Sequence, residues 1–372
     1  MTMNRENYKR LGDYIRLVDV RNRDLAVTNL LGVSISKTFI PSIANTIGTD
    51  MSTYKIVEPY QFAYGPVTSR NGDKITFALY KGAEKCIVSS AYVTFEITNK
   101  EKLDPDYLMM WALRPEFDRY ARFMSNGSAR EMFSWDEMCE VYLPIPDIDV
   151  QRRIVAEYQA VEKRIATNEA LIAKLEETAQ SIYRKVFVDN LDFQNLPDGW
   201  KFGTLRDIAE CFDSKRKPMS GDARQGMEKK YPYYGAAALM DYVDDYIFDG
   251  EYVLMGEDGS VQKEDGTPVL QFVRGKIWVN NHAHVLRGQN GFDNNLLWLK
   301  LSSTVITDIV TGGVQAKINQ ENMFSIPVLI PPVFILEDIK RKINPIFSYR
   351  FQLERENMIL DELKDTLLAK LA

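Results

Sequence analysis

The residues with the most distinctive chemistry are two histidines separated by one position. His282 and His284 alternate along a predicted strand, so both imidazoles would point to one face, where they can bind a metal ion. No cysteine or acidic residue accompanies them at metal-ligand spacing, which favours a core or DNA-facing role. The three cysteines, Cys86, Cys139 and Cys211, are isolated from one another, which excludes CxxC sites and fits a reducing cytosol. We predict no metal.

Three catalytic motifs are incomplete. An amino-methyltransferase needs an acidic or amide residue before Pro-Pro-aromatic, whereas Pro331-Pro332 is followed by Val333 and favours a helix start. A nucleotide-driven motor needs GxxxxGK[ST], and Gly256–Ser260 lacks the lysine, which favours a turn. The acidic-x-Lys pattern at Asp338–Lys340 suits a nuclease, but it begins a predicted coiled-coil helix. The sequence therefore predicts no catalytic residue and no cofactor.

Basic and amide residues in loops are the remaining polar signals, because these side chains contact phosphates and base edges. The densest cluster, Lys215-Arg216-Lys217, precedes Pro218, and an ordinary solvated loop explains it equally well. Another candidate pair stands beside Gly312-Gly313, where a backbone can approach a ligand closely. The candidate DNA contacts are Lys37, Arg70, Asn71, Lys74, Arg130, Lys215, Arg216, Lys217, Lys229, Lys230, Gln315 and Lys317.

Two long helices must position these loops. Between Asp147 and Phe187, apolar residues recur at alternating spacings of four and three, which predicts one helix of about 60 Å with a single apolar seam. The last forty residues repeat this pattern without a gap, at an offset of 185 positions. The residues predicted to pair are Ile154, Tyr158, Val161, Asn168, Leu175 and Ile182 in the first helix and Ile339, Ile343, Ile346, Asn357, Leu360 and Leu367 in the second.

The repeat extends upstream of both helices, which predicts two similar globules. At the same offset Val141 falls on Ile326, and further upstream Leu11–Ile15 matches Leu205–Ile208. Neither globule shows the strand-helix alternation of a doubly wound fold, so the expected class is α+β, with short strands, loops and helices. The predicted order is a globule at 1–146, a helix at 147–188, a second globule at 189–332 and a helix at 333–372.

Two local patterns in the first globule predict specific structures. Asn71-Gly72 favours the tip of a hairpin, at 70–73, because this pair supports the positive φ of tight turns. The segment 104–123 has helical periodicity, and Pro115 inside it should kink or divide the helix.

Composition describes an ordinary chain with room for more than one core. It has 372 residues, 45% hydrophobic and 26% charged, and no apolar run approaches the roughly 20 residues of a membrane span. Its polar start lacks the apolar core of a signal peptide, so a cytoplasmic location is expected. The net charge of −6 argues against nucleic-acid binding, although basic loops can still face a duplex because acidic residues concentrate in the helices.

The chain resembles the specificity subunit of type I restriction-modification systems over essentially its whole length. The matching stretches, whose order and tandem recurrence are specific, are LGDYIRLVDVRN, LLGVSISKTFIPSIANTIGTD, DYVDDYIFDGEYVLMGEDGSV, NNHAHVL and LPIPDIDVQRRIVAEYQAVEKRI. The resemblance implies two target-recognition domains, separated by two antiparallel coiled-coil helices, that each read half of a bipartite double-stranded DNA site. A departure is the polar interruption of the second seam by Arg350, Asn357 and Lys364.

The resemblance also implies partners. Methyl transfer from S-adenosylmethionine would belong to two modification subunits docked on the chain, and cleavage to separate restriction and translocase subunits, so the chain itself would not be an enzyme. The paired helices would fix the length of the unread spacer between the half-sites. Half-sites one turn of the DNA helix apart are separated by about 34–36 Å. If Ile154 lies opposite Leu371 in an antiparallel pair, Asn168 lies opposite Asn357 and sets the register.

Two alternatives remain open. A coiled-coil scaffold with two protein-binding globules would show no salt-dependent, sequence-selective DNA binding. An autonomous enzyme would transfer methyl groups without partners.

Overall fold

The computed structural model describes residues 8–43, 48–69, 71–126, 131–312 and 315–371. It divides into two compact units. Unit 1 comprises Met1–Thr167 and Glu356–Ala372, and unit 2 comprises Asn168–Arg355. Each unit therefore contains one globule and a part of both long helices. In the described part of the chain, no helix combines the length and apolarity of a membrane span.

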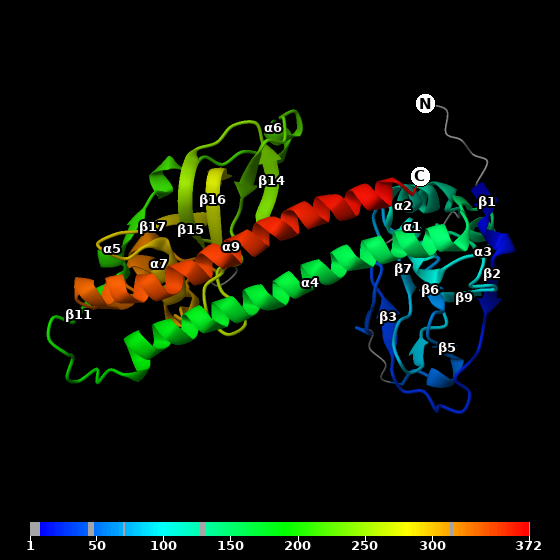
Figure 1. Cartoon of the computed structure of the whole chain (residues 1–372), viewed down its shortest axis with the longest axis horizontal. Helices are drawn as coiled ribbons and strands as arrows, with labels where there is room; N and C mark the ends of the chain where they lie inside the picture. Colours follow the sequence, from blue (N-terminus) through cyan, green and yellow to red (C-terminus); the bar gives the residue numbers. More distant parts are fainter. Residues whose placement is uncertain (1–7, 44–47, 70, 127–130, 313–314, 372) are drawn as a thin grey trace. The chain divides into compact units, whose positions relative to one another are not determined.

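Unit 1 is built on a four-stranded sheet in the order β2-β9-β6-β7, with the pairs β1-β10, β3-β4 and β5-β8 beside it (Figure 1). Short helices complete the globule. The strands are β1 (Tyr8–Arg10), β2 (Ile15–Val18), β3 (Leu31–Val33), β4 (Phe39–Pro41), β5 (Lys55–Val57), β6 (Phe62–Tyr64), β7 (Phe77–Leu79), β8 (Cys86–Val88), β9 (Val93–Ile97) and β10 (Tyr142–Pro144), and the helices are α1 (Pro105–Leu113), α2 (Pro115–Met124) and α3 (Trp135–Cys139).

Aromatic rings fill the core of unit 1. The rings of Phe62 and Phe95 are stacked with centroids 4.9 Å apart, and Phe77 meets Phe117 edge to face at 5.4 Å. Such pairs add about 0.5–1.5 kcal/mol beyond the burial of their area. They join the sheet to α2, so the sheet and the helices of unit 1 share one core.

The predicted hairpin tip at 70–73 lies partly outside the described residues, and the predicted division of the helix at proline is confirmed. β6 and β7 pair antiparallel, and Gly72 in the loop between them has φ +61°, although Arg70 lies outside the described residues. The predicted helix is divided at proline, because α1 ends at Leu113 and α2 begins with Pro115, where the missing N–H costs no hydrogen bond.

Unit 2 has a six-stranded sheet in the order β12-β17-β15-β16-β13-β14 and the separate pair β11-β18. Its longest strand, β16, contains Gly275 with φ +80°, a conformation that glycine adopts without strain. The strands are β11 (Lys201–Thr204), β12 (Ala209–Cys211), β13 (Tyr231–Tyr234), β14 (Leu239–Val243), β15 (Phe248–Gly256), β16 (Leu270–Val279), β17 (Ala283–Gly288) and β18 (Pro327–Ile330), and the helices are α5 (Leu205–Ile208), α6 (Gly221–Gln225), α7 (Asn294–Ser302) and α8 (Gln320–Phe324).

The predicted repeat is visible in the backbone of both units. In unit 1 the N–H of Leu11 donates to the carbonyl of Val141 at 2.8 Å, and in unit 2 Leu205 donates to Ile326 at 2.8 Å. The first strand of each unit, β1 or β11, pairs antiparallel with the last strand before a long helix, β10 or β18. The two globules therefore share a frame, while their central sheets differ in strand number and order.

The long helices are α4 (Ile148–Arg184), which continues as a π-helical turn at Lys185–Asp189, and α9 (Val333–Ala369) (Figure 1). In unit 1 the beginning of α4 packs with the end of α9, because Val155 and Tyr158 share a core with Leu367 and Leu368. In unit 2 the end of α4 packs with the beginning of α9, because Tyr183 shares a core with Ile339. The two helices therefore run antiparallel within each unit, as expected.

The polar interruption of the second seam has a structural explanation at Arg350. Its guanidinium is buried, lies 3.1 Å from Glu176 and 3.0 Å from Glu354, and faces the ring of Trp298 at 5.1 Å. The arginine thus joins α9 to α4 and to α7 inside unit 2. The predicted pairing of Asn168 with Asn357 crosses the division between the units and stays a prediction.

Candidate functional site

Two loops that the sequence offered as separate candidates meet at Glu257 in unit 2. The guanidinium of Arg216 lies 2.6 Å from one carboxylate oxygen of Glu257, and the ammonium of Lys317 lies 3.6 Å from the other. Arg216 also donates to the carbonyl of Ala283 at 2.6 Å. One acidic side chain, 15% exposed, therefore holds the basic loop after β12 beside the loop before α8.

Backbone hydrogen bonds hold two further loops at the same place. Glu257 donates its N–H to the carbonyl of His282 at 2.8 Å and accepts from the N–H of Ile318 at 2.8 Å. The predicted turn at Gly256–Ser260 is confirmed, and a Cβ on Gly256 would lie 2.5 Å from the carbonyl oxygen of Ser260. We call the described residues 213–221, 256–260, 280–284, 311–312 and 315–320 the loop cluster.

Within the loop cluster, a buried histidine and a buried aspartate bond the loops to one another. His284 on β17 is fully buried, with Nδ1 2.6 Å from the carboxylate of Asp213 and Nε2 2.9 Å from the carbonyl of Ile318. Both ring nitrogens of His284 therefore have a hydrogen-bond partner inside the fold. Asp213 also accepts from the N–H of Val285 at 2.9 Å and from Gln320 at 2.7 Å. The predicted core role of His284 is confirmed.

The pKa of Asp213 reflects these bonds. Burial alone raises the pKa of this carboxyl group, but the hydrogen bond and charge of His284, the N–H of Val285 and the charge of Arg216 lower the pKa to about 2. Asp213 is therefore a carboxylate at neutral pH. It ties the start of the basic loop to β17.

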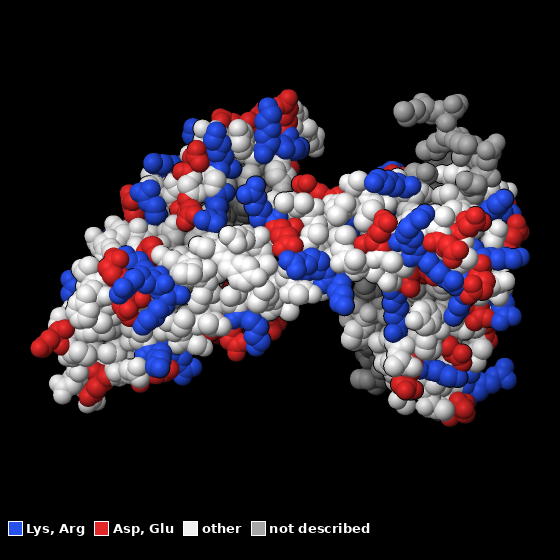
Figure 2. Space-filling model, viewed as in Figure 1, with Lys and Arg blue, Asp and Glu red and all other residues white. Residues whose placement is uncertain are grey.

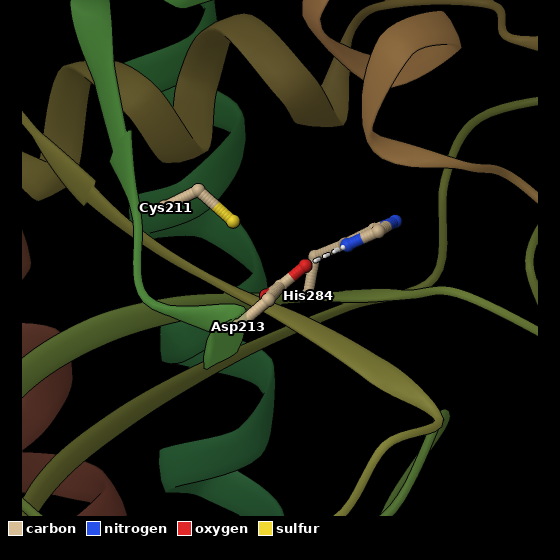
Figure 3. Close-up of side chains that lie close together, drawn as sticks. All are labelled: Cys211, Asp213 and His284. Carbon is tan, nitrogen blue, oxygen red and sulfur yellow. Dashed lines mark hydrogen bonds and ion pairs between the residues drawn. The ribbon is translucent and has the colours of Figure 1, made fainter. Parts of the chain in front are cut away.

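Cys211, Asp213 and His284 form the cluster that most resembles a metal centre among the described residues. Their ligand atoms lie within 4.8 Å of one another, and the marked bond among them joins Asp213 to His284 (Figure 3). Burial raises the pKa of the Cys211 thiol to about 12, so it is not a thiolate at neutral pH. Both nitrogens of His284 are already bonded. The arrangement therefore fits a hydrogen-bonded core rather than a metal site.

Some predicted contacts lie at the surface of the loop cluster, and one does not. Lys215, Lys217 and Gln315 are exposed, and the side chain of Lys317 is 51% exposed. The interpretation of Arg216 as a DNA contact is wrong, because its side chain is 11% exposed and its donors are used by Glu257 and backbone carbonyls.

The other predicted pair in unit 2 lies elsewhere on the surface. Lys229 binds Asp241 at 2.9 Å, and Lys230 binds Glu228. These lysines precede β13 and lie beside β14, outside the loop cluster. Their charges are balanced locally by acidic side chains.

The candidates in unit 1 have different outcomes. The interpretation of Lys37 as a DNA contact is wrong, because its side chain is buried, with the ammonium 2.9 Å from Asp118 and bonded to the carbonyl of Ala112. Asn71 uses its side-chain amide on the carbonyl of Val67 in the hairpin loop. Lys74 is exposed. Two further candidates, Arg70 and Arg130, lie outside the described residues.

Basic and acidic side chains are interspersed over the visible face of the molecule (Figure 2). This distribution agrees with the net charge of −6 and gives no continuous basic surface on that face. Any contact with phosphates would therefore depend on individual loops.

The structure also reveals residues that the sequence did not single out. Glu257, Asp213 and Gln320 hold the loop cluster, and the indole N–H of Trp278 donates to the carbonyl of Lys217 at 2.6 Å. No motif spacing joins them, because they come from loops far apart in the chain. Their only signal in the sequence was proximity to the basic and glycine-rich segments.

The chain is similar to one protein family over most of its length. The family described as "Type I restriction modification DNA specificity domain" matches twice, at residues 18–177 and 197–364. A putative type I restriction enzyme specificity subunit of Haemophilus influenzae is 34% identical over 140 residues, which cover 38% of this chain and 35% of that protein. The specificity subunit of a type I restriction enzyme, MjaIX, of Methanocaldococcus jannaschii is 22% identical over 74% of this chain and 70% of that protein.

A solved structure shares the fold. The S subunit of a type I restriction-modification system from M. genitalium aligns with a TM-score of 0.56 over 100% of this chain and 98% of that one, at 14% identity. At this identity the likeness concerns the fold alone.

Proposed function

Because the chain belongs to the type I restriction-modification DNA specificity family, we propose that each of its globules reads one half of a bipartite double-stranded DNA site. The observation that carries the proposal is the double match to a DNA specificity domain on a repeated frame. The hydrogen bond from Leu11 to Val141 recurs as that from Leu205 to Ile326, while the sheets beside these bonds differ. Similar frames that carry different loops suit an asymmetric site.

In unit 2 the loop cluster is the proposed DNA contact. It presents Lys215, Lys217, Gln315 and Lys317 at the surface, and lysine and glutamine suit phosphates and base edges. Base readout needs side chains held in a defined geometry, and the buried network around Glu257 supplies that support.

The corresponding contacts in unit 1 rest on fewer residues. Lys74 and Asn71 belong to the loop between β6 and β7, and Lys74 is the exposed member of the pair. We propose this loop as the reading element of the first globule.

The chain itself is proposed to select DNA without chemistry. The family is one of specificity subunits, and the chain lacks the methyltransferase and motor motifs discussed above. Methyl transfer is assigned to two modification subunits that dock on the helices, and cleavage to restriction and translocase subunits of the full complex, in the cytoplasm. The paired helices α4 and α9 are proposed to fix the length of the unread spacer.

Methylation mapping tests this function. The full chain is co-expressed with its modification subunits, and modified adenines are located in genomic DNA by long-read sequencing. We expect one motif with two specified halves and a fixed gap. Replacement of residues 201–330 by the matching globule of another member of the family should change one half and leave the other unchanged.

A scaffold without DNA contacts makes the opposite prediction. It would leave genomic methylation unchanged when residues 201–330 are exchanged, and it would show no salt-dependent DNA binding in the assembled complex. Either result contradicts the proposed function.

A further inference from the structure

An open apolar pocket of about 540 Å³ lies in unit 2, where the end of α4 meets α7 and the strands β11 and β18. Its walls include the stacked rings of Tyr183 and Phe187, whose centroids lie 4.4 Å apart. Phe193 and Phe202 also line it, and their side chains are 49% and 61% exposed. Large apolar side chains around a pocket that faces solvent are typical of an interaction site.

One ammonium group lies in this apolar pocket without a counter-ion. Lys300 belongs to the last turn of α7, between the buried Leu299 and Leu301, and lines the pocket. Within the described part of the chain, no ion pair or side-chain hydrogen bond involves its ammonium, and burial lowers its pKa. Lys300 is half-buried, so its ammonium keeps some contact with water until another chain covers the open pocket. Arg184, which also lines the pocket, is already bonded to Asp189 at 3.0 Å.

The fold does not need a lysine at this position, as the repeat within the chain shows. α1 and α7 each begin after an aspartate whose side chain caps the helix, Asp104 or Asp293. Counted from these caps, the position of Lys300 is occupied in unit 1 by Trp111, which is buried in the core. The same helix therefore folds with an apolar residue there.

We propose that this pocket is the docking site for a segment of a modification subunit that carries a carboxylate next to an aromatic side chain. The carboxylate pairs with Lys300, and the aromatic ring packs between the buried rings of Tyr183 and Phe187 and the exposed rings of Phe193 and Phe202. The pocket is continuous with the end of α4, one of the helices to which the proposed function assigns the modification subunits. The choice of partner rests on that function.

Charge complementarity selects this occupant. An apolar segment alone would cover the half-buried ammonium and remove its water without giving it a partner, which is costly. A carboxylate restores the charge balance, and desolvation on docking strengthens the pair. The wide apolar rim then excludes water from the contact, as around a protein interface hot spot.

Two substitutions in the full chain test the proposal. Lys300→Met keeps the length of the side chain and removes the charge. Lys201→Met is the matched control, because Lys201 is exposed on β11 and neighbours Phe202, so alternation along the strand points its side chain away from the pocket. Binding of the purified modification subunit is measured by isothermal titration calorimetry, and the thermal midpoint of each free chain is measured by scanning calorimetry.

We expect Lys300→Met to weaken binding by at least about tenfold, because one partner of a desolvated charge pair is lost. The thermal midpoint of the free chain should not fall, because the lysine has no partner there. Lys201→Met should match the wild type in both measurements. The proposal is overturned if Lys300→Met binds with the wild-type affinity. It is also overturned if the weaker binding is accompanied by a lower thermal midpoint of the free chain.

A small-molecule probe separates this proposal from the proposed function. 3-Phenylpropionate and its uncharged amide are titrated into the wild-type chain, and the Nζ signal of Lys300 is followed by nuclear magnetic resonance. The acid should bind at least about tenfold more tightly than the amide, and Lys300→Met should abolish the difference. Equal binding overturns the pocket proposal. If the acid is preferred but the modification subunit does not bind the wild type, the proposed function fails and the ligand chemistry of the pocket stands.

Discussion

Replacement of Asp213 by asparagine should weaken unit 2 in a manner that depends on pH. The carboxylate is 3% exposed and accepts hydrogen bonds from His284, Val285 and Gln320. Asparagine keeps the shape of the side chain and removes its charge. His284 then loses its charged partner, and so does Arg216, whose guanidinium lies 3.3 Å from the carboxylate.

The pKa gives the magnitude. The folded-state pKa of Asp213 is about 2, against an ordinary 3.8, so ionisation favours the folded state by roughly 2–3 kcal/mol at neutral pH. Because the folded pKa is depressed, this stability is fully present above the unfolded pKa, near pH 4. It is lost as the pH falls through about 2. The deficit of Asp213→Asn should therefore be largest at pH 7 and should narrow below about pH 4.

Urea unfolding combined with hydrogen exchange measures this deficit locally. With a denaturant slope of about 2 kcal/mol per molar, the midpoint for peptides of β12 and β17 should fall by roughly 1 M at pH 7. Asp338→Asn is the control, because Asp338 lies on the exposed face of α9 and bonds Lys342 there, so little change is expected. An unchanged midpoint at pH 7, or a deficit that does not narrow in acid, would refute the assignment of Asp213 as the charged support of the loop cluster.

Three further predictions concern DNA binding, the core of unit 1 and the helices. Replacement of Lys215, Lys217 and Lys317 together by glutamine should reduce the salt slope of DNA binding by up to about 2.7, at about 0.9 per phosphate contact, in fluorescence anisotropy of the assembled complex. Replacement of three exposed basic residues of α4 by glutamine should leave the salt slope unchanged. An equal reduction of the slope by these control substitutions would show that the loop cluster is not the DNA contact. Lys37→Met should cost about 3–5 kcal/mol by leaving Asp118 buried and unpaired, whereas the double variant with Asp118→Asn should recover much of this in thermal unfolding. No loss in the single variant would disprove the buried pair. Addition of one heptad to both α4 and α9 should lengthen the unread spacer found by methylation mapping, and addition to α4 alone should impair assembly. An unchanged spacer in the doubly extended chain would contradict the proposal that the paired helices fix the spacer length.

The features that the sequence predicted well are those encoded by local periodicity or by self-similarity. The spacing of Tyr158, Val161 and their neighbours is enough to indicate a long helix, because the seam repeats at the helical period. The alignment of Val141 with Ile326 predicted a shared frame, and the same backbone hydrogen bond occurs at both positions. Pro115 marked a helix boundary because proline lacks the N–H that the preceding turn would bond.

The candidate site was predicted less completely, because the role of a charged residue depends on partners that are distant in the chain. Lys37 lies in a polar loop sequence, yet Asp118 binds it inside the core. Arg216 stands between two exposed lysines, yet Glu257 and a backbone carbonyl direct it inward. Composition cannot distinguish Lys37 or Arg216 from their exposed neighbours.

The sequence alone therefore determined the apolar seams of the two long helices, the internal repeat and the lack of a catalytic motif, because each depends on the order of residues along the chain. The tertiary structure decided which basic side chains face solvent and which support the loops. It also placed Lys300 at an apolar pocket whose described lining residues include no carboxylate. The physical reason is that charges pair over a few ångströms in space, and only the packed fold brings remote loops within that distance.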